Sequence, residues 1–312
     1  MRRDFAQVEW DRQTEDDCRQ LVRLAVREDL SREQDLTTLS LVPQEARGAA
    51  AIVARKPGLA AGLAAARTAL DEMQADLTWT PNLRDGDPLE NGTELARLQG
   101  SVRDLLTCER TILNFLGRLC GVATLTRQYV SAVAGTKARI YDTRKTTPGW
   151  RRLEKYAVRL GGGTNHRTGL FDAVLIKDNH LAQAGLNPRE AVEQARRFLL
   201  SAGYADTALP IVEIEVDTLD QFRLVLPVRP DIVLLDNMSL EQLREAVALR
   251  DRVAPQVELE ASGGIQLSTI RGVAETGVER ISVGALTHSA TNLDLGLDWL
   301  AQPRPQVGNL AE

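Results

Sequence analysis

Apolar positions in the first third of the chain follow helical spacing over two segments. Residues 14–30 carry apolar side chains at helical intervals, and Thr14 is placed to cap this helix. A longer helical pattern runs from 101 to about 133, with a break at Gly117 or Gly121 left open. Turn-forming pairs separate the two segments, so the pattern predicts a mixed region rather than a helical bundle.

From residue 138 the pattern changes to short β-branched runs separated by helical sequence. Asn187-Pro188 marks one helix start, and Ser239 with Gln242 has the spacing of a capping box. Strands that alternate with helices predict βαβ units and a parallel sheet. Since no strand is followed by a GxGxxG fingerprint, an α/β barrel, closed or partly open, is favoured over a doubly wound sheet. The expected strands are 138–142, 173–176, 211–216, 231–235, 257–261 and 280–283.

Side chains with chemical potential follow the expected strands at their carboxyl ends. In an α/β barrel these ends converge on one face, where active sites are built. They carry Thr143-Arg144-Lys145, Lys177-Asp178, Asp236-Asn237, Ser262-Gly263-Gly264 and Gly284-Ala285, while Glu213 and Glu215 lie inside the third strand. We therefore expect one pocket that combines cationic groups, carboxylates and glycine-bearing turns.

The basic side chains Arg144, Lys145, Arg167 and Lys177 predict a substrate with several anionic groups. Arginine binds a carboxylate through a planar fork, whereas lysine acts as a mobile point charge. Solvated loop charges are the alternative for an isolated Arg-Lys pair. His166 precedes Arg167, whose like charge predicts a mostly neutral imidazole that donates a hydrogen bond to a carboxylate or ring atom.

The glycine-bearing turns and the carboxylates predict a phosphate-binding half of the same site. Backbone N–H groups at 262–264 and Gly284 suit a phosphate, as in the last two loops of many barrels. Glu215 and Asp236 beside a phosphate predict a shared Mg²⁺, with salt bridges to nearby basic residues as the alternative. The triplet at 161–163 lacks the Lys-Ser/Thr of a Walker loop, and its pattern fits either a mobile flap or a simple turn.

Composition and charge exclude several classes of protein. The 312 residues have a formal net charge of -5, which argues against nucleic-acid binding. No apolar run approaches the roughly 20 residues of a membrane span, and the first residues lack the apolar core of a signal peptide. The 3 cysteines have no metal-ligand spacing and are expected to be reduced thiols. We expect a cytoplasmic protein with no nucleic-acid or membrane partner.

Arg110 occupies an unusual position in the long helical pattern. Leu106, Arg110 and Leu113 lie at helical spacing, which places the guanidinium within an apolar stripe. A charge there needs an anionic partner, from its own chain or from another one.

Taken together, these motifs resemble the quinolinate phosphoribosyltransferase family, also called nicotinate-nucleotide pyrophosphorylase (carboxylating). The likeness runs from about Asp29 to Trp299, with the order and spacing of the motifs intact. The segments that carry it are 142–149, 161–179, 212–216, 234–237, 260–265 and 283–289.

The resemblance implies a fold and an assembly. The fold is α/β, with an incomplete α/β barrel over residues 131–289 and an N-terminal α/β sandwich domain over 1–130, completed by about 290–312. The assembly is a homodimer in which Arg110 reaches the partner's active site.

The resemblance also implies an activity and its residues. Phosphoribosyl pyrophosphate and quinolinate would give nicotinate mononucleotide, CO₂ and pyrophosphate in de novo NAD biosynthesis, with Mg²⁺ as cofactor. The carboxylates of quinolinate would be bound by Arg110, Arg144, His166, Arg167 and Lys177. Lys145, Glu215 and Asp236 would be catalytic and would engage phosphoribosyl pyrophosphate, the last two near Mg²⁺. Substrate would also contact Thr143, Ser262, Gly263, Gly264, Val283, Gly284 and Ala285, and the role of His288 stays open.

Two other functions remain open at this level. One is a paralogue with the same fold that serves molybdenum transport or another pyridine acid, and the intact basic cluster favours quinolinate over it. The other is a non-catalytic phosphate-binding barrel, which has no need for Lys145, Glu215 and Asp236 together.

Overall fold

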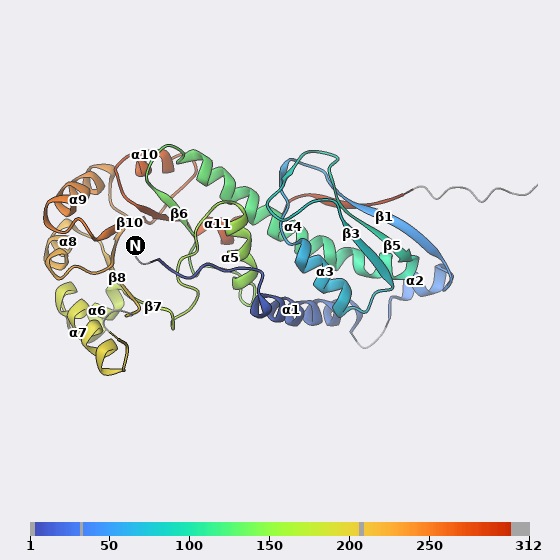
Figure 1. Cartoon of the computed structure of the whole chain (residues 1–312), viewed down its shortest axis with the longest axis horizontal. Helices are drawn as coiled ribbons and strands as arrows, with labels where there is room; N and C mark the ends of the chain where they lie inside the picture. Colours follow the sequence, from blue (N-terminus) through green and yellow to red (C-terminus); the bar gives the residue numbers. More distant parts are fainter. Residues whose placement is uncertain (1–3, 32–33, 206–208, 301–312) are drawn as a thin grey trace, which may run out of the picture. The chain divides into compact units, whose positions relative to one another are not determined.

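The computed structural model describes residues 4–31, 34–205 and 209–300, and these form two compact units (Figure 1). One unit holds residues 4–9 with 124–290, and the other holds 10–123 with 291–300. Residues 4–9 therefore group with the barrel, whereas the prediction from the sequence placed them in the N-terminal domain. The C-terminal segment 290–312, which was expected to complete the N-terminal domain, lies partly outside the described residues.

The first unit along the chain is an antiparallel sheet covered by helices. Its sheet order is β12-β1-β5-β3, and β1 pairs antiparallel with both β5 and β12. The C-terminal strand β12 thus completes the N-terminal domain, as expected. The bounds are α1 Arg12–Leu30, α2 Leu36–Leu41, β1 Arg47–Ala54, β2 Gly58–Leu59, α3 Leu63–Glu72, β3 Leu77–Pro81, β4 Pro88–Leu89, β5 Glu94–Ser101, α4 Val102–Ala132 and β12 Leu295–Trp299.

One local prediction in this unit was wrong, and the structure answers a question that was left open. The cap of α1 is Asp11, whose carboxylate accepts the N–H of Thr14 at 2.8 Å, so the buried Thr14 belongs to the first turn. Helix α4 runs without a break through Gly117 and Gly121. These glycines serve close packing instead, because a Cβ at Gly121 would collide with the backbone carbonyl of Thr291.

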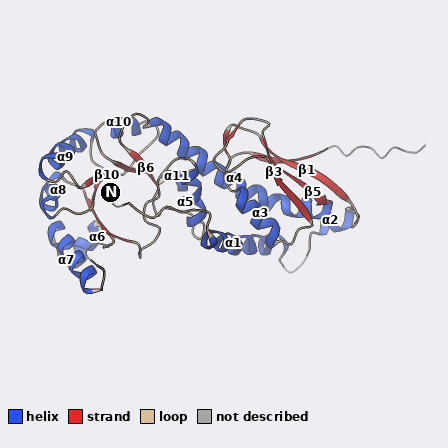
Figure 2. Cartoon of the chain, viewed as in Figure 1, coloured by secondary structure: helices blue, strands red, loops and turns tan. Residues whose placement is uncertain are grey.

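The second unit is an incomplete barrel of parallel strands. The sheet order β6-β11-β10-β9-β8-β7 leaves β6 and β7 at its two ends, so among the described strands the ring does not close. Figure 2 shows α7, α8 and α9 along the outer side of the strands. The bounds are β6 Arg139–Tyr141, α5 Arg151–Leu160, β7 Ala173–Ile176, α6 Asp178–Ala184, α7 Pro188–Ser201, β8 Ile211–Val216, α8 Leu219–Val225, η2 Leu226–Val228, β9 Ile232–Asp236, α9 Leu240–Val253, β10 Glu258–Ser262, α10 Ile270–Ala274, β11 Arg280–Ser282 and α11 Ala285–His288.

All six predicted strands are present, and β7 and β8 have the predicted bounds. The apolar runs predicted them because parallel strands covered on both faces are apolar throughout. The helix caps are confirmed as well. Asn187 accepts the N–H of Glu190 at 3.0 Å, and Ser239 accepts that of Gln242 at 3.3 Å.

Two further expectations concern the whole described chain. The cysteines Cys18, Cys108 and Cys120 are free and buried. Burial raises the pKa of each thiol to about 12, so these side chains are unreactive core residues. Within the described ranges, none of the helices combines the length and the apolar character needed to cross a membrane.

Candidate active site

The carboxyl ends of the barrel strands enclose a cleft of about 260 Å³. Most residues predicted to bind substrate line it, together with Leu175, Leu234, Glu260 and Ser282, which the sequence analysis missed. The missed residues lie inside strands, where the alternation of inward and outward side chains was their only signal. The lining residues are Thr143, Arg144, Lys145, His166, Arg167, Leu175, Lys177, Glu215, Leu234, Asp236, Glu260, Ser262 and Ser282.

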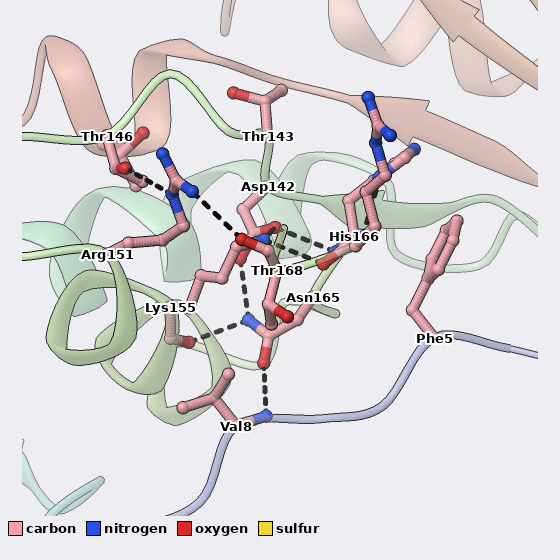
Figure 3. Close-up of polar contacts among 12 residues, drawn as sticks. Phe5, Val8, Asp142, Thr143, Thr146, Arg151, Lys155, Asn165, His166 and Thr168 are labelled. Carbon is pink, nitrogen blue, oxygen red and sulfur yellow. Dashed lines mark hydrogen bonds and ion pairs between the residues drawn. The ribbon is translucent and has the colours of Figure 1, made fainter. Parts of the chain in front are cut away.

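A buried carboxylate holds the loop that carries His166 and Arg167. Asp142, at the end of β6, accepts hydrogen bonds from Asn165 Nδ2 at 2.7 Å and from the His166 N–H at 2.8 Å (Figure 3). It also forms an ion pair with Lys155 on α5, and both side chains are fully buried. Asp142 directly precedes Thr143-Arg144-Lys145 in the sequence, but it does not line the cleft. It supports the loop whose residues do.

Two arginines face the cleft with little to neutralise them. The Nε of Arg144 is buried and, among the residues that the structure describes, has no hydrogen-bond partner. Arg167 is 6% exposed and donates to the Ala173 carbonyl at 3.3 Å. Burial and then the charge of Arg144 lower the pKa of Arg167. An anion between the two guanidinium groups would relieve this repulsion and satisfy the buried donor.

His166 has different electrostatic neighbours from those predicted. Its Nε2 lies 3.1 Å from Glu213 Oε2 and 3.5 Å from Glu260 Oε1. Burial opposes the charged ring, but the two carboxylates outweigh it and raise the pKa of His166. The predicted cause, a like charge on Arg167 that lowers this pKa, was therefore wrong, because two carboxylates face the ring instead. The sequence could not reveal these carboxylate neighbours of His166, because Glu213 and Glu260 lie in strands distant from it along the chain.

Glu260 is a buried carboxyl group at the floor of the cleft. Burial, followed by the charge of Glu213, raises the pKa of Glu260 to about 7. Glu213 and Glu215 lie on the same face of β8, as alternation predicts, but they differ in surroundings. Glu213 is fully buried beside His166, whereas Glu215 reaches the cleft.

Three acidic side chains form a cluster at the cleft, and two of them, Glu215 and Asp236, line it. Carboxylate oxygens of Glu215, Asp217 and Asp236 lie within 4.8 Å of one another, a set of oxygen donors that suits Mg²⁺. The sequence analysis missed Asp217, although it directly follows β8. Lys177 Nζ lies 2.9 Å from Glu215 Oε2, so the salt-bridge alternative for Glu215 is also realised. His166, Glu213 and Glu260 form a second donor set, but they are buried in the barrel interior.

The two glycine-bearing turns flank the cleft. Gly263 has φ +91°, and a Cβ there would collide with the side chain of Asn237, so only glycine fits. At Gly284 a Cβ would lie 3.0 Å from Cδ of Lys145, which shows how closely that turn approaches a lining residue. Ser262 of the first turn lines the cleft, whereas Gly263, Gly264, Gly284 and Ala285 are not among the lining residues.

Val283 does not fit its predicted role. Its side chain is 1% exposed, and its N–H donates to the Tyr141 carbonyl at 2.9 Å, so it has no free donor for a phosphate. The glycine triplet at 161–163 ends α5 in a hydrogen-bonded turn, and a Cβ at Gly163 would lie 2.7 Å from Val158 Cγ1. This packing favours the simple turn over a mobile flap.

Two predicted residues stand apart from the cleft lining. Arg110, on α4 in the other unit, is exposed, so its guanidinium does not lie within an apolar stripe of its own chain. In the described part of the chain it forms no ion pair. His288 is exposed at the end of α11, with its Nδ1 2.8 Å from the Ser289 hydroxyl.

Comparison with known proteins gives consistent matches over nearly the whole chain. Residues 35–120 match the family described as "Quinolinate phosphoribosyl transferase, N-terminal domain", and residues 122–298 match its C-terminal domain. A "Nicotinate-nucleotide pyrophosphorylase [carboxylating]" of Mycobacterium leprae is 45% identical over 91% of this chain and 97% of its own length. A probable enzyme of the same name from Bacillus subtilis is 39% identical over 85% of this chain and 87% of its own length. The solved nicotinate-nucleotide pyrophosphorylase of Francisella tularensis has a TM-score of 0.85 and 35% identity, covering 95% of this chain and 100% of that one.

Proposed function

This chain belongs to the quinolinate phosphoribosyltransferase family, and we propose how its cleft divides the two substrates of that reaction. It transfers the phosphoribosyl group of phosphoribosyl pyrophosphate to quinolinate with decarboxylation, in NAD biosynthesis. The observation that carries the proposal is that one cleft of about 260 Å³ is lined by both cationic and acidic side chains. Arg144 and Arg167 belong to the first set, and Glu215 and Asp236 to the second.

The cationic side binds the two carboxylates of quinolinate. Arg144 offers a buried Nε that lacks a partner among the described residues, and Arg167 is held beside it by its bond to the strand β7. His166 and Lys177 line the same cleft and are assigned to the same carboxylates, with Lys177 leaving its pair with Glu215 when quinolinate binds. A dicarboxylate is the ligand class that pairs with such a group, because each arginine fork matches one carboxylate.

The acidic side and the glycine-bearing turns bind phosphoribosyl pyrophosphate. Lys145 meets the pyrophosphate, and the turns at 262–264 and 284–285 present backbone N–H groups to the 5′-phosphate. Glu215 and Asp236, with Asp217, would hold Mg²⁺ and the ribose hydroxyls. Mg²⁺ bound there supplies positive charge that neutralises the pyrophosphate oxygens.

The chemistry needs positioning and neutralisation more than covalent work by the protein. The quinolinate nitrogen attacks the anomeric carbon, and the bond from that carbon to pyrophosphate breaks, so the electron pair leaves with the pyrophosphate. The ring nitrogen is then cationic and accepts the electrons of the adjacent carbon–carboxylate bond as CO₂ departs; a proton replaces the lost carboxylate. Arg144 and Arg167 fix the ring, and Lys145 stabilises the leaving group.

The cleft of a single chain lacks Arg110, and we place that residue in the cleft of a partner chain. Arg110 is exposed and has no ion-pair partner within the described residues, so it is free to meet an anion elsewhere. In a homodimer, quinolinate bound in the partner's cleft would supply the carboxylate that pairs with Arg110. The three free, buried cysteines suit the cytoplasm, where we expect the enzyme to act.

Turnover with alternative acceptors tests this function. The purified protein with Mg²⁺, phosphoribosyl pyrophosphate and quinolinate should form nicotinate mononucleotide, detected by chromatography. Nicotinate in place of quinolinate should give little or no product, because half of the arginine cluster is then left unpaired. Equal turnover of both acids, or no turnover of either, would contradict the proposal and favour the paralogous or the non-catalytic alternative.

A further inference from the structure

The described start of the chain closes the end of the barrel opposite the cleft. Phe5 is 6% exposed and packs with Ala173, Ile211 and Ile232, which are the first residues of β7, β8 and β9. The cleft is lined from the carboxyl ends of the same strands. Phe5 therefore fills the barrel interior from below the site.

The ring of Phe5 also contacts a cleft residue directly. It stacks on the imidazole of His166 with a centroid distance of 4.3 Å and an angle of 28° between the rings. The edges of the imidazole are occupied, since Nδ1 accepts the Arg167 N–H at 2.8 Å and Nε2 faces Glu213. Phe5 thus restrains one face of the His166 ring, the face on which it stacks.

Gln7 and Val8 hold the backbone beside His166. The Val8 N–H donates to Asn165 Oδ1 at 2.7 Å (Figure 3). Gln7 Oε1 accepts the Asn165 N–H at 2.8 Å, and Gln7 Nε2 donates to the Asn165 carbonyl at 3.2 Å. Three hydrogen bonds therefore tie residues 7–8 to the residue that precedes His166, and Asn165 passes the restraint on to Asp142.

The segment is anchored at its other end by charge. Asp4 Oδ1 lies 3.1 Å from Arg280 Nη2, and Asp4 Oδ2 lies 2.6 Å from Arg139 Nη1 and accepts the Tyr141 hydroxyl at 2.9 Å. The guanidinium of Arg280 lies 5.4 Å from the centre of the Phe5 ring, in cation–π range. These contacts fix Phe5 on both sides.

We propose that residues 4–8 are a positioning element for the active site, and that Phe5 is a positioning residue that holds the His166 ring, and through its Nδ1 the backbone of Arg167, in place for quinolinate. The inference rests on the assignment of His166 to quinolinate. A plug that only stabilises the barrel needs apolar volume, and leucine supplies it. A positioning role needs the flat ring, because a stack restrains rotation of the imidazole.

Kinetics of the full-length enzyme separate these roles. Phe5→Leu should raise KM for quinolinate by about tenfold and leave KM for phosphoribosyl pyrophosphate within about twofold, since small misplacement of a binding group is costly. Phe5→Tyr keeps the ring and should restore most of the quinolinate affinity. Ile232→Val is the matched control, because it alters the same apolar cluster without touching His166, and its KM values should not change.

Loss of quinolinate affinity in Phe5→Leu but not in Ile232→Val supports the proposal. Unchanged constants in Phe5→Leu, or an equal rise of both KM values, would overturn it. If Phe5→Leu does not fold, Gln7→Ala decides, because it removes two bonds to Asn165 from the half-buried edge of the segment, and it should raise only KM for quinolinate. Wild-type turnover in the same assay tests the function separately, so the two failures are distinguishable.

Discussion

Lys177 Nζ lies 2.9 Å from Glu215 Oε2, and this ion pair joins a cationic and an acidic residue of the cleft lining. The lysine side chain is 46% exposed and the glutamate 12%, so solvent screens the pair. Its contribution to folding is therefore small, while both groups line the cleft. The pair is positioned to exchange partners when two anionic substrates enter.

The first prediction concerns Glu215→Gln. The free energy of unfolding should change by less than about 1 kcal/mol, because the lost pair is partly exposed. In contrast, kcat should fall on the order of 10²-fold, because a charge near the reacting ribose and Mg²⁺ is lost. Thermal melts and steady-state turnover of the same preparation measure both. Glu245→Gln, which removes the surface pair with Arg223, is the control and should change neither. A large loss of stability with full activity would contradict this account.

The second prediction divides the cleft. Arg144→Ala should weaken quinolinate by about 1.5–3 kcal/mol, the usual cost of a lost hydrogen bond to a charged group. Binding of phosphoribosyl pyrophosphate should change far less, and Lys145→Ala should show the reverse pattern. Calorimetric titration with each substrate gives both affinities. Equal weakening of both substrates by Arg144→Ala would show that the two sides are not separate.

The third prediction tests Arg110 across the dimer. Arg110→Ala and Lys145→Ala should each be nearly inactive. Coexpressed as mixed dimers, they should recover about a quarter of wild-type activity, because half of randomly paired dimers contain one intact site of two. If the mixture is no more active than the separate variants, Arg110 does not complete the site of a partner.

The fourth prediction concerns the turn at Gly263. Gly263→Ala combines a φ of +91° with a collision against Asn237. Gly264→Ala has a φ of +59° but open space, so it should cost only about 1–2 kcal/mol of backbone strain. Gly263→Ala should therefore lower the melting temperature more and also weaken phosphoribosyl pyrophosphate. Similar melting temperatures for the two variants would show that the Asn237 contact is unimportant.

The fifth prediction follows from a buried ion pair outside the cleft. Glu279 accepts from Arg250 at 2.8 Å twice and from Lys137 at 2.7 Å. Although burial alone raises the pKa of Glu279, these bonds lower it to about 2, against an ordinary value of 4.5. Because the folded-state pKa is the lower one, the stabilisation is complete above about pH 4.5 and is lost as the pH falls toward 2.

Glu279→Gln should therefore reduce stability at neutral pH by about 3 kcal/mol, since it leaves the buried Arg250 with only the exposed Asp251 as its charge partner. The difference from wild type should shrink below pH 4.5 in chemical denaturation. A difference that stays constant from neutral pH to pH 3 would mean that the ionised carboxylate is not the stabilising form.

The sequence predicted the strands and most of the cleft for a physical reason. Buried parallel strands are continuous apolar runs, and the polar residues that interrupt them mark the carboxyl ends where a site forms. What it could not predict depends on contacts between distant segments. The carboxylates around His166 come from β8 and β10, and Phe5 reaches it from the start of the chain.

The exposure of Arg110 and the hydrogen-bonded N–H of Val283 also depend on contacts that the sequence alone could not predict. A helical stripe records only spacing, so it could not show which side of α4 is left uncovered. A strand end likewise does not reveal whether its N–H is already taken by a neighbouring strand, as the Val283 N–H is by Tyr141.

The release of CO₂ tests the central claim most directly. Quinolinate labelled in the carboxylate next to the ring nitrogen should lose its label as CO₂ only when phosphoribosyl pyrophosphate and Mg²⁺ are present. One equivalent of pyrophosphate and one of nicotinate mononucleotide should accompany each CO₂. Absence of labelled CO₂, or its release without pyrophosphate, would contradict the assignment of this cleft to quinolinate phosphoribosyl transfer.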